Sequence, residues 1–173
     1  MITASHNLGP DNGIQLVDPK GEMLETAYES VATKLANCKD VDTPSQFDEI
    51  VKQFYIPEGD NLVVVGRDPG VSSPALSTAC LTGIAAAGWR VQDIGVVTTP
   101  QPQLNTKCGY GEASIPGYYD KITRAFKKLL VLDKGSYRNK VVFDGPNVVG
   151  APTMSQFKRL AGVLEAEMVN TGK

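Results

Sequence analysis

Cysteine and histidine are scarce in this chain, whose 173 residues include three cysteines and a single histidine. The cysteines, Cys38, Cys80 and Cys108, lie far apart and form no C-x-x-C pair. This spacing argues against a zinc site and against a disulfide framework. Because an odd, dispersed set of thiols is typical of a reducing compartment, we expect a cytoplasmic location.

The sequence also lacks an excess of positive charge and a long apolar run. The formal net charge is −2 and the pI is about 5.4, so we expect no nucleic-acid partner and no anionic membrane surface as a partner. The longest nearly apolar stretch, residues 83–89, is far too short to span a bilayer. No charged-then-apolar targeting signal is found.

Short apolar runs alternate with amphipathic segments along the chain. The apolar runs predict strands over residues 14–17, 62–66, 91–97 and 140–144. Apolar residues at helical spacing predict helices over residues 22–36, from 43 onward, from 72 to about 88, over 117–132 and over 153–168. This order predicts a mostly parallel sheet with helices on both faces. The β-branched run at 62–66 indicates a strand buried on both sides, and Ser72-Ser73-Pro74 is expected to cap the helix that follows.

A polar segment divides the predicted elements into two unequal groups. We expect a first domain over residues 1–133, a linker over 134–139 and the start of a second domain over 140–173. The last segment is too short to bury a core of its own.

The first thirteen residues carry the densest set of chemically useful side chains. Ser5, His6 and Asn7 place a hydroxyl, an imidazole and an amide side by side, and a turn-rich segment follows at residues 9–13. The small residues before Ser5 would let a phosphate approach the backbone, so the loop suits a serine that carries a phosphoryl group. The alternative is a solvated loop without a function. Because only two residues precede this loop in the sequence, we expect no strand to hold it in place.

A Ser-His hydrolase is the remotest of the possible functions. Adjacent side chains on an extended chain point to opposite sides, so Ser5 and His6 are poorly placed as a nucleophile and its base. The sequence also contains no G-x-S-x-G elbow.

The residues from Thr3 to Asn7, followed by Asp11-Asn12-Gly13, resemble the active-serine signature of the α-D-phosphohexomutases. The run from Asp11 to Pro19 is similar to the acetylglucosamine-phosphate branch of that family. The resemblance extends from Met1 to about Phe126. It implies a three-layer α/β/α fold with a mixed, mostly parallel sheet, as an incomplete first domain followed by the first βα unit of a second domain.

The resemblance also implies a chemistry and a set of site residues. Ser5 would be a phosphoserine that exchanges its phosphoryl group with a hexosamine phosphate substrate. N-acetylglucosamine 6-phosphate and 1-phosphate would interconvert through a sugar bisphosphate, serving UDP-N-acetylglucosamine biosynthesis. His6 would donate a hydrogen bond beside the transferring group, and Arg67 and Asn7 would form the active-site wall. Mg²⁺ would bridge the Ser5 phosphate and a downstream Asp-rich loop, since a hard divalent cation suits a phosphate dianion.

Structural interpretations stand beside these functional ones. His6 could be a loop imidazole without a role, and Arg67 with Asp68 could merely anchor its loop. We expect Asn7 and Asn12 to shape the turn through bonds from side chain to backbone, and Gly13 to supply a backbone geometry that other residues resist. The remaining candidates are a turn at Thr98 and Thr99, and helix-face packing by Tyr118 and Tyr119.

The sequence departs from the family pattern at several positions. Leu8 stands where proline is usual, Gln15 where lysine is common, and Pro69-Gly70 where Thr-Arg usually follows. Asp144-Gly145 stands without the other carboxylates of an Asp-Gly-Asp-x-Asp metal loop, which does not occur. We therefore expect a mutase fragment without turnover of its own. The alternatives are phosphoglucomutase- or phosphomannomutase-type activity, or a non-catalytic remnant or interaction module. An exposed sheet edge predicts self-association.

Overall fold

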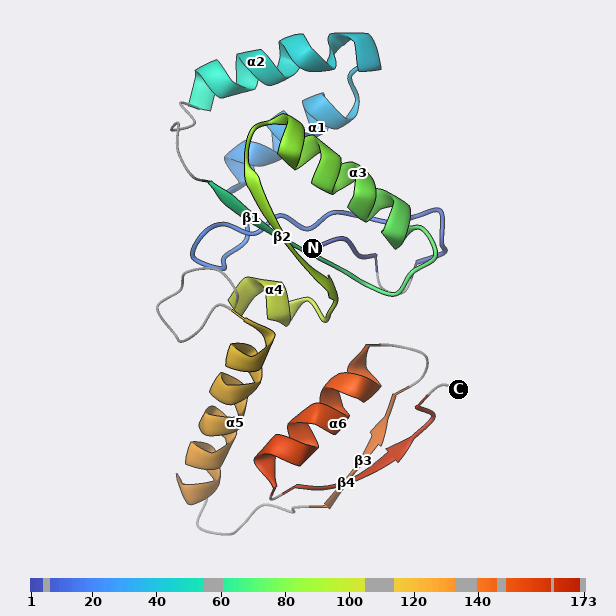
Figure 1. The fold of residues 1–173 in the computed structure, drawn as a ribbon, viewed down its shortest axis with the longest axis vertical. Helices are drawn as coiled ribbons and strands as arrows, with labels where there is room; N and C mark the ends of the chain where they lie inside the picture. The colour runs from blue at the N-terminus through green and yellow to red at the C-terminus, as the bar shows by residue number, and fades with distance from the viewer. Residues whose placement is uncertain are drawn as a thin grey trace.

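The computed structural model of the chain describes residues 1–4, 7–54, 61–104, 114–132, 140–145, 149–162 and 164–171. Ser5, His6 and the expected linker at 134–139 lie outside these residues. The described elements form two groups, one built around strands β1 and β2 and the other around β3 and β4 (Figure 1). The prediction of an α/β fold with parallel sheets is confirmed.

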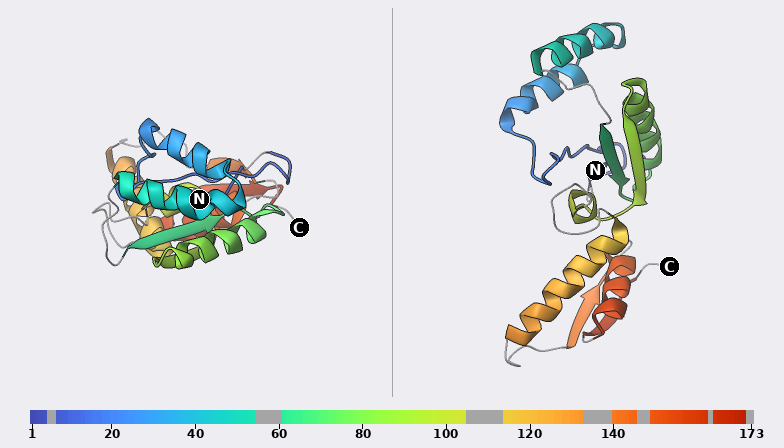
Figure 2. Two further views of the ribbon diagram at one scale, coloured as in Figure 1. Left: turned by 90° about the horizontal axis from the view of Figure 1, so that it is seen from above. Right: turned by 60° about the vertical axis from the view of Figure 1, so that its left-hand side comes forward.

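The first sheet pairs β1 (Leu62–Arg67) with β2 (Arg90–Val96) in parallel, and α3 (Ser73–Ala86) connects them. Helix α3 lies on one face of this sheet and the N-terminal segment crosses the other (Figure 2). The strands expected at 62–66 and 91–97 are thereby confirmed. The register shifts between Val65 and Arg67, where the opposite strand carries Gly95 in a left-handed conformation with φ 72°.

The core of this sheet sits at the carboxyl end of β1. Val65 and Gly66 are buried, whereas the Leu62 side chain at the start of the strand is 47% exposed. The prediction of burial on both faces is therefore wrong for the start of the strand. The buried end is the one that faces the N-terminal segment.

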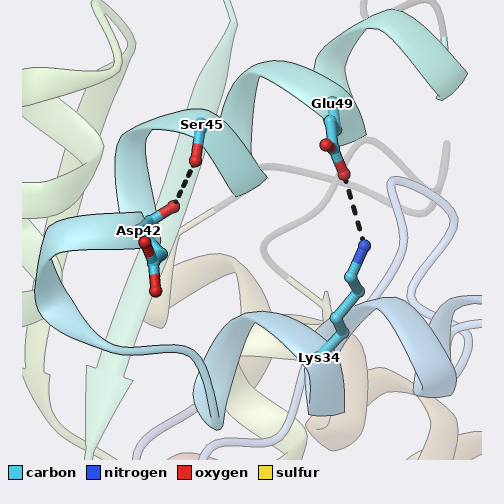
Figure 3. Close-up of polar contacts among 4 residues, drawn as sticks. All are labelled: Lys34, Asp42, Ser45 and Glu49. Carbon is cyan, nitrogen blue, oxygen red and sulfur yellow. Dashed lines mark hydrogen bonds and ion pairs between the residues drawn. The ribbon is translucent and has the colours of Figure 1, made fainter.

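Helices α1 (Glu29–Ala36) and α2 (Thr43–Phe54) lie side by side, each preceded by a short 3₁₀ turn, η1 (Thr26–Tyr28) and η2 (Asp40–Asp42). The rings of Tyr28 and Phe54 lie 5.1 Å apart. Lys34 and Glu49 form an exposed ion pair at 3.3 Å between the two helices (Figure 3). The Ser45 hydroxyl donates to the Asp42 carbonyl at the start of α2.

The strand expected at 14–17 does not form, and the helix expected from 22 begins only at Thr26. Ile14 pairs with Ile2 for a single residue, and Val17 pairs with Met23 across a turn. The Asp18 carboxylate closes this turn by accepting the backbone N–H of Glu22 at 2.8 Å. Because residues 22 and 23 are used in this pairing, they cannot begin a helix.

The second group contains α5 (Ile115–Leu132), β3 (Lys140–Asp144), α6 (Gly150–Ala161) and β4 (Glu165–Val169), and a short helix, α4 (Pro100–Leu104), precedes it. Strands β3 and β4 are parallel. The helix expected over 153–168 is wrong beyond Ala161, because Gly162 ends α6 in a left-handed conformation with φ 68°. The N–H of Gly162 donates to the backbone carbonyl of Lys158.

Helix α5 belongs spatially to both groups. It contacts α4, and it contacts α6 through the rings of Phe126 and Phe157, whose centroids lie 5.4 Å apart at an interplanar angle of 71°. Within the described ranges, no helix combines the length and the apolar character that crossing a membrane requires.

Candidate functional site

The segment before Ser5 is joined to the buried end of β1. Ile2 is 1% exposed, its N–H donates to the Gly66 carbonyl at 2.8 Å, and its own carbonyl accepts the N–H of Asp68 at 3.0 Å. Ile2 thus forms a parallel β-bridge with Arg67 of β1 and an antiparallel β-bridge with Ile14. The described residues before the loop form no strand, as expected, but the isolated bridges of Ile2 tie this segment to β1.

Asp68 follows β1 directly and collects hydrogen bonds from three directions. Its Oδ2 accepts the Thr3 hydroxyl at 2.8 Å. Its Oδ1 accepts the backbone N–H of Gly70 at 2.8 Å and the hydroxyl of Ser73. The carboxylate therefore ties the residues just before Ser5 to the start of α3.

The segment after Ser5 is tied to the same helix end through Asn12. Its Nδ2 donates to the hydroxyls of Ser72 at 3.0 Å and Ser73 at 2.9 Å. The Ser72 hydroxyl donates in turn to the Gly9 carbonyl at 2.7 Å. Helix α3 begins within the expected Ser72-Ser73-Pro74 segment, with Ser72 at the N-cap position, but no side-chain bond caps it there. The Ser72 hydroxyl serves the N-terminal segment instead.

The two flanks of the serine segment also bind each other. The N–H of Thr3 donates to the Gly13 carbonyl at 2.9 Å, and the N–H of Gly13 donates to Oδ1 of Asn12 at 2.8 Å. Gly13 does not have a positive φ, so the unusual backbone expected there is wrong. A side chain at position 13 is restricted by lack of space instead, because a Cβ added to Gly13 would lie 3.3 Å from the Thr3 carbonyl oxygen.

The electrostatics of Asp68 reflect this network. Burial alone would raise the pKa of its carboxyl, but the bonds donated by Ser73, Gly70, Thr3 and Ala4 outweigh burial and lower the pKa below its ordinary value. Asp68 is therefore held as a carboxylate whose lone pairs are already occupied by donors from the protein.

A pocket of about 410 Å³ lies where these elements meet. The N-terminal segment, the β1–α3 turn, the end of β2 and the start of α6 all contribute to its wall. The lining residues with polar side chains are Thr3, Asn7, Asp11, Asn12, Asp68, Ser72, Thr98 and Thr99. This position at the carboxyl end of parallel strands is where α/β folds bind ligands.

The remaining candidate residues divide between the pocket and its surroundings. Asn7 lines the pocket and its backbone N–H donates to the Ala4 carbonyl at 2.8 Å. Arg67 is not among the lining residues of the described chain, and its guanidinium donates to the Asp68 carbonyl at 3.3 Å. This contact favours the anchoring interpretation of Arg67, and its role in the wall stays a prediction.

The Thr98 turn and the tyrosine pair have structural contacts. The N–H and hydroxyl of Thr98 both donate to Oε1 of Gln101, at 2.7 and 3.1 Å, as expected for a turn. Tyr118 and Tyr119 stack edge to face at 5.5 Å and line a separate apolar pocket of about 250 Å³ beside β3 and α6. Burial raises the pKa of Tyr118, and these contacts favour packing over a sugar platform.

The described residues do not fit a complete magnesium site. No group of three or more His, Cys, Asp or Glu side chains in this part of the chain could hold a metal ion. Asp11 and Asp68 line the pocket, but protein donors occupy the carboxylate of Asp68. A hard cation prefers six or more oxygen ligands, so we assign no chemical step to a metal here.

Comparison with known proteins identifies a family model and several relatives that are similar to this chain. Residues 46–115 match the family model of phosphoglucomutase/phosphomannomutase, alpha/beta/alpha domain I. Phosphoacetylglucosamine mutase of Sus scrofa is 37% identical over 99% of this chain, and that of Candida albicans is 34% identical over 90% of it. Over nearly its whole length the chain is similar to phosphohexomutases. The prediction from the serine-loop residues is confirmed.

Solved structures of phosphohexomutases share the fold over nearly the whole chain. A serine-to-alanine variant of Aspergillus fumigatus N-acetylphosphoglucosamine mutase, in complex with glucose 1,6-bisphosphate, has a TM-score of 0.88 and 33% identity over 98% of this chain. The same fungal enzyme in complex with GlcNAc-6P and magnesium has a TM-score of 0.84. The chain covers 33% of each of these two chains, and 33% and 32% of the two curated relatives named above.

Sequence reasoning found the serine loop and expected Asn12 to shape its turn, but it missed the hydrogen-bonded group that joins Asn12 to Asp68 through Ser73. Asp68, Ser73 and Asn12 form one hydrogen-bonded group although they are about sixty residues apart from end to end. The available signal was local, because an Asp directly after a buried strand and a Ser pair at a helix start lie at the same edge of a parallel sheet.

Proposed function

We propose that this chain is the serine-loop part of a phosphoacetylglucosamine mutase, an isomerase that interconverts N-acetylglucosamine 6-phosphate and 1-phosphate through a sugar bisphosphate. The observation that carries the proposal is the pocket at the carboxyl ends of β1 and β2, whose wall contains the residues on both sides of Ser5. Phosphoryl transfer requires an acceptor oxygen that is held in line with the donor, and a pocket at this position suits that requirement. The names and ligands of the relatives support the choice of an acetylated amino sugar.

In the proposed mechanism, the protein's contribution is positioning. Ser5 carries the phosphoryl group, His6 donates a hydrogen bond to it, and Asn7 with Arg67 shapes the wall. Magnesium, when bound, would cancel phosphate charge, and the carboxylates for it would have to come from outside the described residues. We assign 1–133 and 140–173 to different domains of the complete enzyme, although the contact of Phe126 with Phe157 crosses that boundary.

The setting and the associations of the chain are also proposals. A cytoplasmic location is supported by the free thiols of Cys38 and Cys80 and by the nature of the substrate, a charged sugar phosphate. Self-association is supported by the exposed apolar side chains of the strands, such as Leu62 and Val142, which are 47% and 63% exposed.

A chimera tests the proposed function. This chain replaces the matching third of the Candida albicans relative, and turnover of N-acetylglucosamine 6-phosphate is measured with a hexose 1,6-bisphosphate and Mg²⁺. We expect turnover by the chimera, loss of turnover in its Ser5→Ala variant, and no turnover by the 173-residue chain alone. A folded chimera that is inactive, or one that keeps its activity after Ser5→Ala, would contradict the proposal.

A further inference from the structure

We propose that Asp68 is a positioning residue for the serine loop, acting with Thr3 on one side of Ser5 and, through Ser73, with Asn12 on the other. This inference rests on the proposed function, because it concerns how the phosphoryl-accepting hydroxyl is held. It goes beyond the motif, since neither Asp68 nor Ser73 is assigned a role by the serine signature.

The first step of the argument is geometric. Asp68 accepts the Thr3 hydroxyl at 2.8 Å, so this carboxylate holds the residue two positions before Ser5. The N–H of Asp68 donates to the Ile2 carbonyl at 3.0 Å. Two consecutive residues, Ile2 and Thr3, thus take their position from Asp68.

The second step concerns the residues after Ser5. Ser73 is fully buried, donates its hydroxyl to Asp68 and accepts Nδ2 of Asn12 at 2.9 Å. A buried hydroxyl between two partners has little freedom to move, because losing either bond leaves a polar atom unsatisfied. Asn12 is therefore fixed relative to the same carboxylate that fixes Thr3.

The third step concerns reactivity. We define the four bonded residues Thr3, Asn12, Asp68 and Ser73 as the clasp. The loop that contains Ser5 starts and ends on these residues, and its two flanks are also bonded to each other between Thr3 and Gly13. A displacement of about 1 Å in the attacking group can slow an enzymatic reaction by about a hundredfold. The clasp therefore controls the rate of transfer and leaves the affinity for the sugar to other groups.

Hydrogen exchange on the 173-residue chain tests the clasp without any catalysis. We expect Asp68→Asn and Thr3→Val to accelerate exchange of the Thr3 and Gly13 amides by roughly tenfold or more relative to the amides within α3. Thr3→Ser keeps the hydroxyl and is expected to restore protection. Asp93→Asn, which alters an exposed carboxylate on β2, is the matched control. Unchanged relative exchange in both Asp68→Asn and Thr3→Val would overturn the inference.

Kinetics of the active chimera supply the second readout. Thr3→Val is expected to lower kcat by roughly tenfold to a hundredfold with KM unchanged, whereas Thr3→Ser keeps kcat close to that of the parent. A rise in KM at constant kcat would show that Thr3 binds sugar and would overturn the positioning role. If the parent chimera has no turnover, the proposed function fails, and hydrogen exchange alone still decides whether the clasp exists.

Discussion

The backbone N–H of Ile2 donates a 2.8 Å hydrogen bond to the carbonyl of Gly66, which joins the segment before the serine loop to the buried half of β1. Gly66 also packs closely against Val97, the residue that follows β2. A side chain at this position would therefore disturb both the sheet and the segment before Ser5.

We expect Gly66→Ala to lower the free energy of unfolding by about 1–3 kcal/mol, because an added methyl group overpacks this site. Its Cβ would lie 2.6 Å from Cγ2 of Val97 and 3.1 Å from Cγ of Pro102. Denaturant unfolding followed by circular dichroism measures the change. Gly83→Ala is the control, since a Cβ at Gly83 in α3 has no neighbour within 4 Å, and alanine is expected to stabilise the helix by about 0.5–1 kcal/mol. Equal effects of the two substitutions would contradict the close packing.

Glycines have different roles at different positions of this fold, and the sequence alone does not show which role each one has. Gly13 and Gly66 are restricted by space, whereas Gly162 has a positive φ and ends α6. The apolar spacing of residues 153–168 predicted one long helix because it continued past Gly162, and β4 was missed for that reason. Gly162 was the local signal for the helix end.

The serine loop could be predicted because its chemistry is contiguous in sequence, whereas its support could not. Thr3 and Asp68 are 65 residues apart, and Asn12 and Ser73 are 61 residues apart. Their meeting depends on how β1 and α3 pack, which periodicity does not reveal. The strand expected at 14–17 failed for a similar reason, since Ile14 finds only a single partner residue, Ile2, in the described chain.

We expect the stabilisation supplied by Asp68 to disappear in acid. The pKa of its carboxyl is lowered in the folded state, so its contribution is fully present above the unfolded pKa of about 3.9 and is lost as the pH falls through the folded pKa. At neutral pH, Asp68→Asn is expected to be less stable than the parent chain by about 1–3 kcal/mol. Denaturant unfolding at a series of pH values measures this difference. A difference that stays constant below pH ~4 would show that the carboxylate charge does not contribute.

We expect the α5–α6 contact to be energetically coupled. The rings of Phe126 and Phe157 lie edge to face at 5.4 Å, and such pairs contribute about 0.5–1.5 kcal/mol beyond their burial. A double-mutant cycle with Phe126→Ala and Phe157→Ala measures the coupling from unfolding free energies. Strictly additive effects of the two substitutions would contradict the coupling between these rings.

We expect the chain to self-associate through its apolar strands, and a single charge to weaken this association. Val142 is 63% exposed on β3, which belongs to a two-stranded sheet in the described part of the chain, so one backbone edge of β3 has no strand partner there. Lysine on such an edge discourages pairing with another chain. Light scattering after size exclusion should give a mass that rises with concentration for the parent and much less for Val142→Lys. Val41→Lys, at an 83% exposed position in η2, is the control that should leave association unchanged. A parent chain that is monomeric at every concentration would contradict the prediction.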